Sequence, residues 1–218
     1  MEKNQAKKNM LFILYVFLLF CFLIISFILI SNEMSNNKLV YFDNGVIAAV
    51  QSHISPALTN VMLTFTFLGS VKWLTIAVLA GTLFLFIKRK WALGLFFLLS
   101  SGVGSLFNVL LKNIFKRQRP DIHRLITENS YSFPSGHSMG AFIFYGAIAY
   151  IILHYAHKKA AKTFGIVLMA VFILLIGTSR VYLGVHYPSD VIGGYSAGGA
   201  WLMICIIVFR YYEYRKNL

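Results

Sequence analysis

The chain has 218 residues, of which 58% are hydrophobic and only 12% are charged, and its formal net charge is +13. A mean hydropathy of +0.71 and a charged fraction about half that of globular proteins exclude an ordinary soluble domain. No soluble segment carries the positive charge as a basic patch, so we expect no nucleic-acid partner; in a membrane protein such charge sets orientation and meets anionic lipid. Cys21 and Cys205 each lie within an apolar run, which predicts neither a disulfide framework nor a metal site.

The first apolar run covers residues 10–30 and is long enough, at about 1.5 Å per residue, to cross roughly 30 Å of bilayer hydrocarbon. Lysines precede it, as they do in a signal peptide. The run is nevertheless longer than the apolar part of a usual signal peptide, and residues 31–34 lack a small-residue cleavage pattern. We therefore expect an uncleaved membrane anchor.

The next segment, residues 44–68, is only moderately apolar and is interrupted by polar residues and by Pro56. Its composition favours an interfacial or partly re-entrant helix over a full crossing. Five later apolar runs are candidates for membrane spans: residues 71–87, 91–115, 137–155, 163–179 and 190–209.

No linker or repeat divides the chain. The sequence therefore predicts an all-α, polytopic membrane protein, in which six transmembrane helices form one bundle with an added interfacial helical segment. Residues 1–218 form a single membrane-embedded domain in this interpretation. Gly194 and Gly198 give the last helix a small face, for which packing within the bundle and homodimerisation both remain open, as does the oligomeric state.

The charges of the loops predict the orientation of the bundle. If the amino terminus is cytoplasmic, the basic residues at 88–90 and 158–162 also lie inside, in agreement with the positive-inside rule, and the stretch 112–124 is the exception. A seventh crossing through residues 44–68 would place 88–90 outside, which fits less well. We therefore expect a multi-pass protein of the plasma (inner) membrane with both termini in the cytoplasm.

Three polar clusters stand out in this apolar chain. They are Lys112-x6-Arg119-Pro120, Pro134-Ser135-Gly136-His137 and Ser179-Arg180-x5-His186-x3-Asp190. The predicted topology brings all three to the outer membrane face. Ionisable groups in membrane segments are costly and usually functional, so we expect one site there.

The residue types of the first two clusters suit an anionic ligand. Lys112 and Arg119 can bind the non-bridging oxygens of a phosphate, the guanidinium in bidentate fashion. Ser135 is a suitable N-cap, and Gly136 lets the backbone amides at the helix start approach an anion closely. Each cluster also has a structural explanation, as a basic helix end at lipid headgroups or as an ordinary capped helix.

The third cluster suits nucleophilic catalysis. His186 and Asp190 are four residues apart, and Pro188 is typical of a helix start. Asp190 can hold one imidazole nitrogen, which leaves the other to face a substrate in the neutral, nucleophilic form. Arg180 adds a third cation. The alternative explanation is a structural His–Asp pair at a helix start.

Together the clusters resemble, without a substitution, the K-x6-R-P, P-S-G-H and S-R-x5-H-x3-D signature of the type-2 phosphatidic acid phosphatase superfamily, the membrane lipid phosphate phosphatases. The resemblance covers core motifs at residues 112–190, and the predicted helix count matches bacterial six-helix members. It implies hydrolysis of a terminal phosphate from a lipid phosphate or diphosphate through a phosphohistidine intermediate. The implied substrates are phosphatidylglycerophosphate, undecaprenyl diphosphate or phosphatidic acid, and the partners are that lipid and the bilayer.

The resemblance also implies a role for each matched residue. His186 attacks phosphorus and is oriented by Asp190, while His137 protonates the leaving group and later helps to activate water. The remaining matched groups hold the phosphate oxygens: Lys112, Arg119, Arg180, Ser135 and the amide of Gly136.

We expect no metal ion or other cofactor, because three cations can neutralise the phosphate. The outer acidic residues are scattered along the sequence, and we expect them to be solvated: Glu33, Asp43, Asp121 and Glu128. Lys116 and Arg117 lie outside the signature, and we expect them to touch lipid headgroups.

Two other functions remain open at this point. A lipid-phosphate transporter or flippase without hydrolysis would explain the cations but not the pairing of His186 with Asp190. Vanadate-dependent haloperoxidase-like chemistry is the second alternative, because those soluble enzymes have similar site motifs; the lipid-facing architecture argues against it.

Overall fold

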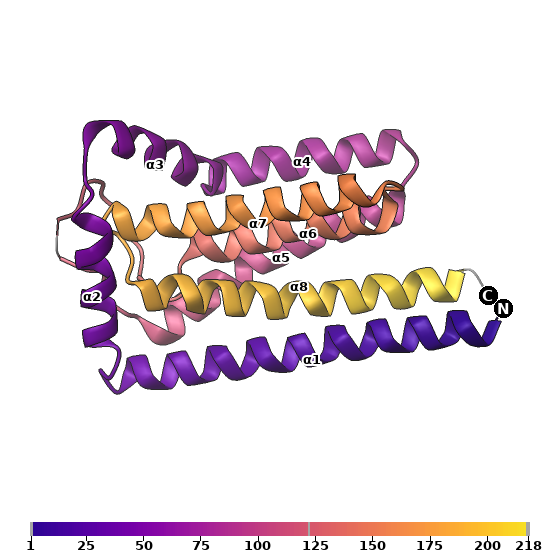
Figure 1. Ribbon diagram of the computed structural model, residues 1–218, viewed down its shortest axis with the longest axis horizontal. Coiled ribbons are helices and arrows are strands. Elements are labelled where there is room, and N and C mark those ends of the chain that lie inside the picture. Colours follow the sequence, from indigo (N-terminus) through magenta and orange to yellow (C-terminus); the bar gives the residue numbers. More distant parts are fainter. Residues whose placement is uncertain (1, 122, 217–218) are drawn as a thin grey trace.

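The computed structural model describes residues 2–121 and 123–216, with side chains from Met10 onward, and these residues form eight α-helices and no strand (Figure 1). The helices are α1 (Glu2–Ser35), α2 (Val40–Gln51), α3 (Pro56–Leu68), α4 (Val71–Ile87), α5 (Trp91–Phe115), α6 (Gly136–Tyr155), α7 (Lys159–Tyr182) and α8 (Pro188–Lys216). The prediction of an all-α membrane protein is confirmed.

Five helices are long and apolar enough to cross a membrane, namely α1, α5, α6, α7 and α8. A sixth span arises when α3 and α4 are counted together, because these two helices meet with a bend of 48°. The break has a local cause: the Ser70 hydroxyl accepts a hydrogen bond from the Trp73 amide and so caps a new helix. The predicted number of six crossings therefore holds if this bent pair is one span.

The segment at residues 44–68 is two helices rather than one. Helix α2 lies across one end of the bundle (Figure 1), as an interfacial helix should, whereas α3 packs along α7 and leads into α4. Ser55 separates the two helices, because its side chain accepts from the Leu58 amide and Pro56 occupies the first turn. The polar residues and the proline near position 55 thus mark a helix boundary, which sequence analysis took for interruptions of a single segment.

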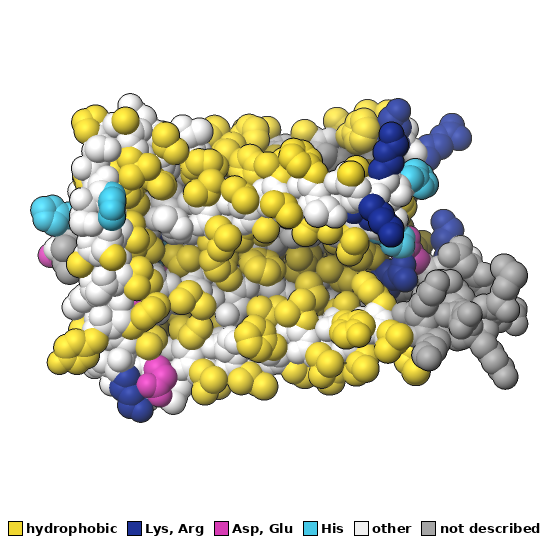
Figure 2. Space-filling view, in the orientation of Figure 1, with side chains coloured by type: hydrophobic (Ala, Val, Ile, Leu, Met, Phe, Trp, Pro, Cys, Tyr) yellow, Lys and Arg dark blue, Asp and Glu magenta, His cyan; other side chains and the backbone are white. Residues whose placement is uncertain are grey.

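Helices α6 and α8 form the centre of the bundle. A Cβ atom added to Gly194 or Gly198 would lie 2.8 Å from a backbone carbonyl oxygen of α6 or of its N-cap, so these glycines allow the two helices to pack closely. This small face is used inside the bundle. Figure 2 shows the outer surface of the helices covered with hydrophobic side chains, which is the surface expected to face lipid.

Candidate active site

The three polar clusters meet at the end of the bundle that α2 crosses. A cavity of about 360 Å³ there is lined by Lys112, Arg119, Gly136, His137 and His186. These are five of the eight residues expected at the site. The other three, Ser135, Arg180 and Asp190, are buried, and the contacts below connect them to the same cluster.

The start of α6 presents its backbone to the cavity. Ser135 is fully buried, and its hydroxyl accepts hydrogen bonds from the Ser138 amide (3.3 Å) and the Ser138 hydroxyl (2.9 Å). Gly136 packs against α5, because a Cβ at this position would lie 3.0 Å from Oδ1 of Asn108. The Ser135 hydroxyl therefore serves as the helix cap, and the open amides of the first turn are the groups that face an anion.

His186 lies in the short connection between α7 and α8 and is 1% exposed. Its Nε2 atom is 3.1 Å from Nη1 of Arg119. A guanidinium can only donate, so Nε2 accepts and the proton of the neutral imidazole is on Nδ1. Burial lowers the pKa of His186 to about 3, although Asp190 acts to raise that pKa. The imidazole is thus neutral, with a lone pair on Nε2.

Ser132 lies between His186 and Asp190, a position that sequence analysis missed. Its hydroxyl is 3.2 Å from Nδ1 of His186 and donates to Oδ2 of Asp190, while the direct distance from Nδ1 to that oxygen is 3.4 Å. The backbone amide of Tyr187 donates to the same carboxylate oxygen at 2.8 Å. Asp190 is fully buried, so these donors replace water around Oδ2.

Arg117 and Asp43 belong to the same network, and the sequence-based expectations for both are wrong. Arg117 does not face lipid headgroups: its Nη1 donates to Oδ1 of Asp190 at 2.7 Å and its Nη2 to Oδ2 of Asp43 at 2.8 Å. Asp43 is not solvated but fully buried. The one signal available in the sequence was that an acidic residue is rare in so apolar a chain and therefore tends to be paired.

Arg180 is 1% exposed and forms an ion pair with Glu128, with 2.5 Å between Nη2 and Oε1. Glu128 lines the cavity and its side chain is 29% exposed, so this carboxylate is partly open to solvent as well as paired with Arg180. Nη1 of Arg180 donates to the hydroxyl of Thr66, and its Nε has no hydrogen-bond partner among the described residues. One donor of this buried guanidinium is thus left for a ligand.

The link between α5 and α6 holds the other two cations. Lys112 donates to the carbonyl oxygen of Tyr131, and Arg119 donates to the carbonyl oxygens of Ser130 (2.6 Å) and Val185 (2.7 Å). This link is closed at its base, where the Ser132 amide donates to the carbonyl oxygen of Arg117 at 2.8 Å. Among the residues that the structure describes, no cluster of three or more His, Cys, Asp or Glu side chains could hold a metal ion.

Comparisons with known proteins identify the family of the chain. The PAP2 superfamily model matches residues 91–214. Phosphatidylglycerophosphatase B of Bacillus subtilis is 41% identical over 145 residues, which are 66% of this chain and 71% of that protein. Decaprenylphosphoryl-5-phosphoribose phosphatase of Mycobacterium tuberculosis is 31% identical over 137 residues, or 59% of this chain and 66% of that protein.

The fold is similar as well. The crystal structure of a transmembrane PAP2-type phosphatidylglycerolphosphate phosphatase from Bacillus subtilis superposes with a TM-score of 0.81 at 33% identity, covering 88% of this chain and 96% of that one. Carrier and haloperoxidase functions find no support among these relatives, which are named as phosphatases. The chain therefore belongs to the PAP2 superfamily, and it is a membrane lipid phosphatase.

Proposed function

We propose that the enzyme removes the terminal phosphate of a lipid phosphate or diphosphate by attack of His186 Nε2 on phosphorus. The observation that carries this proposal is the state of His186. Its imidazole is neutral, its proton lies on Nδ1 toward Ser132 and Asp190, and its Nε2 lies beside the Arg119 guanidinium at the cavity. A nucleophile oriented by a buried carboxylate is the arrangement that covalent catalysis requires.

The reaction then has two steps. In the first, a bond forms between Nε2 of His186 and phosphorus while the bond from phosphorus to the lipid oxygen breaks, and protonated His137 gives its proton to that oxygen. In the second, water attacks phosphorus, its proton passes to His137, and the phosphorus–nitrogen bond breaks to release inorganic phosphate. His137 lines the same cavity from the first turn of α6, which supports this role.

Fixed cations support the binding of the phosphate. Lys112 and Arg119 line the cavity, and Arg180 has a buried Nε that lacks a partner among the described residues. Together with the first-turn amides of α6, these donors suit the equatorial oxygens of the transition state. Within the part of the chain that the structure describes, Glu128 is the one carboxylate that lines this cavity, and it has to share Arg180 with the incoming phosphate.

The remainder of the cavity supports a lipid substrate. From the polar end the cavity continues between α4, α5 and α6, where Leu74, Val78, Leu98 and Phe144 line it. A hydrocarbon chain fits such a lining, while the phosphate stays at the charged end. The two relatives are named for a glycerophospholipid and for a polyprenyl lipid, and we propose that this enzyme accepts both substrate classes.

A second cavity, of about 580 Å³, adjoins the first and shares Val109, Lys112, Arg119, Glu128 and Ser130 with it. Its other lining residues all carry polar groups: Asn113, Gln118, Arg124, Asn129 and Tyr131. We propose that water enters and phosphate leaves through this polar cavity, so that the lipid does not have to move aside between the two steps.

We further propose that the site faces the outside of the cell and that both termini are cytoplasmic. Exposed basic side chains, among them Lys88, Arg89 and Lys158, gather at the end opposite the site (Figure 2), in accordance with the positive-inside rule. In a protein whose Cys21 and Cys205 are replaced by alanine, Tyr41→Cys on α2 should react with an impermeant thiol reagent in intact cells, and Lys158→Cys should react only after lysis. The reverse pattern would contradict this orientation.

The activity itself is tested with purified protein in detergent and a panel of lipids. Phosphatidylglycerophosphate, phosphatidic acid and undecaprenyl diphosphate should each release inorganic phosphate, because the charged side chains of the cavity bind only the phosphate end of the lipid. Turnover should be the same with and without a chelator, since the cations of the chain neutralise the phosphate. Binding of these lipids without phosphate release would contradict the proposal.

Substitution of the two histidines separates their roles. His186→Ala should abolish turnover and the acid-labile phosphoenzyme, and His137→Ala should lower kcat by about 10²–10⁴-fold, the usual contribution of general acid catalysis. The control is Lys116→Ala, at an exposed position next to Arg117, which should keep near-normal activity. Large residual turnover in His186→Ala would identify another nucleophile.

The neutral state of His186 also predicts how stability depends on pH. Its pKa is about 3 in the folded protein and about 6.5 in the unfolded chain, so between these values the unfolded state binds more protons. Acidification from pH 6.5 to 4 should therefore lower the free energy of unfolding by up to about 1.4 kcal/mol per pH unit through this residue. Thermal unfolding in detergent should show a weaker pH dependence for His186→Asn; equal slopes would mean that His186 does not titrate this way.

A further inference from the structure

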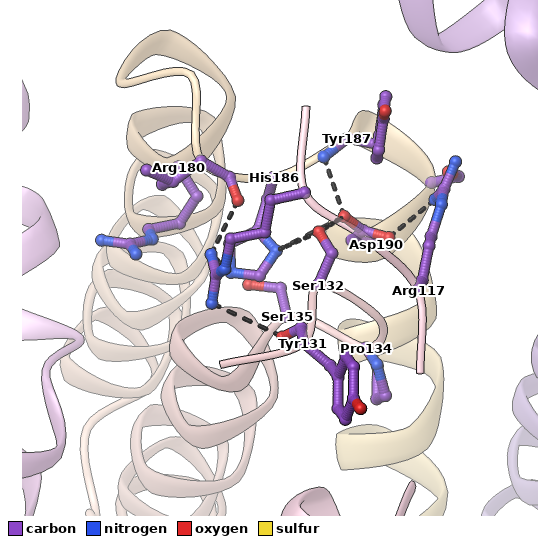
Figure 3. Close-up of polar contacts among 12 residues, drawn as sticks. Arg117, Tyr131, Ser132, Pro134, Ser135, Arg180, His186, Tyr187 and Asp190 are labelled. Atoms are coloured by element: carbon purple, nitrogen blue, oxygen red, sulfur yellow. Dashed lines mark hydrogen bonds and ion pairs between the residues drawn. The ribbon is translucent and has the colours of Figure 1, made fainter. Parts of the chain in front are cut away.

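We propose that Arg117 and Asp43, both outside the signature motifs, are a positioning pair that holds the Asp190 carboxylate in the orientation His186 needs. The inference rests on the proposed role of His186 and assigns function to two residues that do not touch the substrate cavity. Its basis is the way in which the two oxygens of Asp190 divide their partners (Figure 3).

Oδ2 of Asp190 faces the histidine and is engaged by Ser132 and the Tyr187 amide. Oδ1 points the other way, and among the described residues its one hydrogen-bond donor is Nη1 of Arg117, at 2.7 Å. A fully buried carboxylate oxygen without a donor is costly. Removal of Arg117 would therefore let the Asp190 carboxylate rotate or form other hydrogen bonds. This movement would change the Oδ2 contacts that orient His186.

Asp43 fixes the guanidinium on its other side. Nη2 of Arg117 donates to Asp43 at 2.8 Å, and Cζ of the guanidinium lies 4.0 Å from the ring centre of Tyr187. Asp43 is itself held by Ser189, through the backbone amide at 2.9 Å and the hydroxyl at 2.7 Å. Contacts on several sides leave Arg117 one orientation, and that orientation is the one that reaches Asp190.

The pair also adjusts the charge around His186. The groups that face this imidazole are Asp190, which favours its protonation, and the cations Arg119 and Arg180, which oppose it; His137 lies across the cavity. Arg117 offsets part of the negative charge of Asp190. Without the guanidinium, His186 would hold a proton more tightly, and a larger fraction would be protonated and unable to attack at acidic pH.

The same contacts could serve only to hold α2 against α8. The experiment must therefore separate this purely structural role from the positioning role. A purely structural role affects only the fraction of folded molecules, so kcat per folded molecule would stay normal at every pH. A positioning pair changes kcat with little effect on KM, and it makes the loss depend on pH. Contact with lipid headgroups, the sequence-based expectation for Arg117, would instead raise KM.

The test compares Arg117→Gln, Arg117→Lys and Asp43→Asn with wild type in the full-length protein, using phosphatidic acid in detergent micelles. Lys116→Gln is the matched control, because it removes a positive charge from the adjacent exposed residue. Arg117→Gln should lower kcat by about 10–100-fold, the usual cost of removing a group that orients a reacting residue, with KM within about twofold. The ratio of its kcat/KM to that of wild type, in which substrate ionisation cancels, should fall further as the pH is lowered.

The remaining variants guard against misfolding of Arg117→Gln. Arg117→Lys should have a higher kcat than Arg117→Gln, because lysine keeps the positive charge. It should stay below wild type, because an ammonium lacks the planar donor geometry of the guanidinium. Asp43→Asn should lower kcat less than Arg117→Gln, and the double variant should lose less than the product of the two single losses. Normal kcat in Arg117→Gln, a loss that is equal at all pH values, or a change confined to KM would each overturn the positioning role.

Assaying His186→Ala beside these variants distinguishes this inference from the proposed function. If His186→Ala retains the turnover of wild type, the proposed nucleophile is wrong and the positioning pair falls with it. If turnover depends on His186 while Arg117→Gln remains fully active at every pH, the positioning pair alone is wrong.

Discussion

The pairing of buried charges around Arg117 is the constraint on which the rest of this end of the molecule depends. Removing an ion from water costs several kcal/mol unless a partner compensates it, and here Asp43 and Asp190 are both fully buried with one guanidinium between them. The three residues come from α2, from the link after α5 and from the start of α8. Loss of Arg117 would leave two buried carboxylates without their cation, and loss of either aspartate would remove one of the two ion pairs that join these segments, so the three segments are held in one arrangement. His186 lies in the turn just before α8, so this arrangement of the segments also fixes the position of His186.

The same end of the bundle solves a problem of solvation for a lipid phosphatase. The substrate has a highly charged end and a hydrocarbon end, and the protein offers a cation cluster that opens directly onto an apolar lining between α4, α5 and α6. The cations are kept in place by carbonyl oxygens of the link between α5 and α6 and by Glu128, before any phosphate arrives. Such prearranged donors need little reorganisation when charge develops on the phosphate, which is the main advantage that a fixed site has over water.

Sequence analysis predicted the parts of this molecule that depend on composition and on motif spacing. The long apolar runs became α1, α5, α6, α7 and α8, because a backbone in lipid has to satisfy its own hydrogen bonds. The residues of the motifs meet in one place because each motif lies at a helix end and these ends coincide. The break between α3 and α4 was predicted, but the one between α2 and α3 was missed, because Ser55 as a helix cap is a local signal that a hydropathy window averages away.

The partners of the motif residues were not predictable in the same way. Asp43 and Arg117 are more than seventy positions apart, and so are Arg117 and Asp190; no periodicity connects them. Ser132 and Glu128 lie in a segment without regular structure, where nothing in the pattern indicates which side chains turn inward. A charged residue in an apolar chain indicates that a partner exists, but only the tertiary structure identifies that partner.

The closure between Ser132 and Arg117 has a consequence for the evolution of such enzymes. The hydrogen bond at the base makes the intervening chain an Ω-like loop, which is attached a second time where the Leu125 amide donates to the carbonyl oxygen of Leu183. Lengthening such a loop costs only a slowly growing closure entropy, about 0.6 kcal/mol per doubling. Insertions beside Asp121, whose side chain is 97% exposed, should therefore be tolerated while the two attachments of the loop keep its ends in place, which offers a simple route by which this end of the scaffold can diversify.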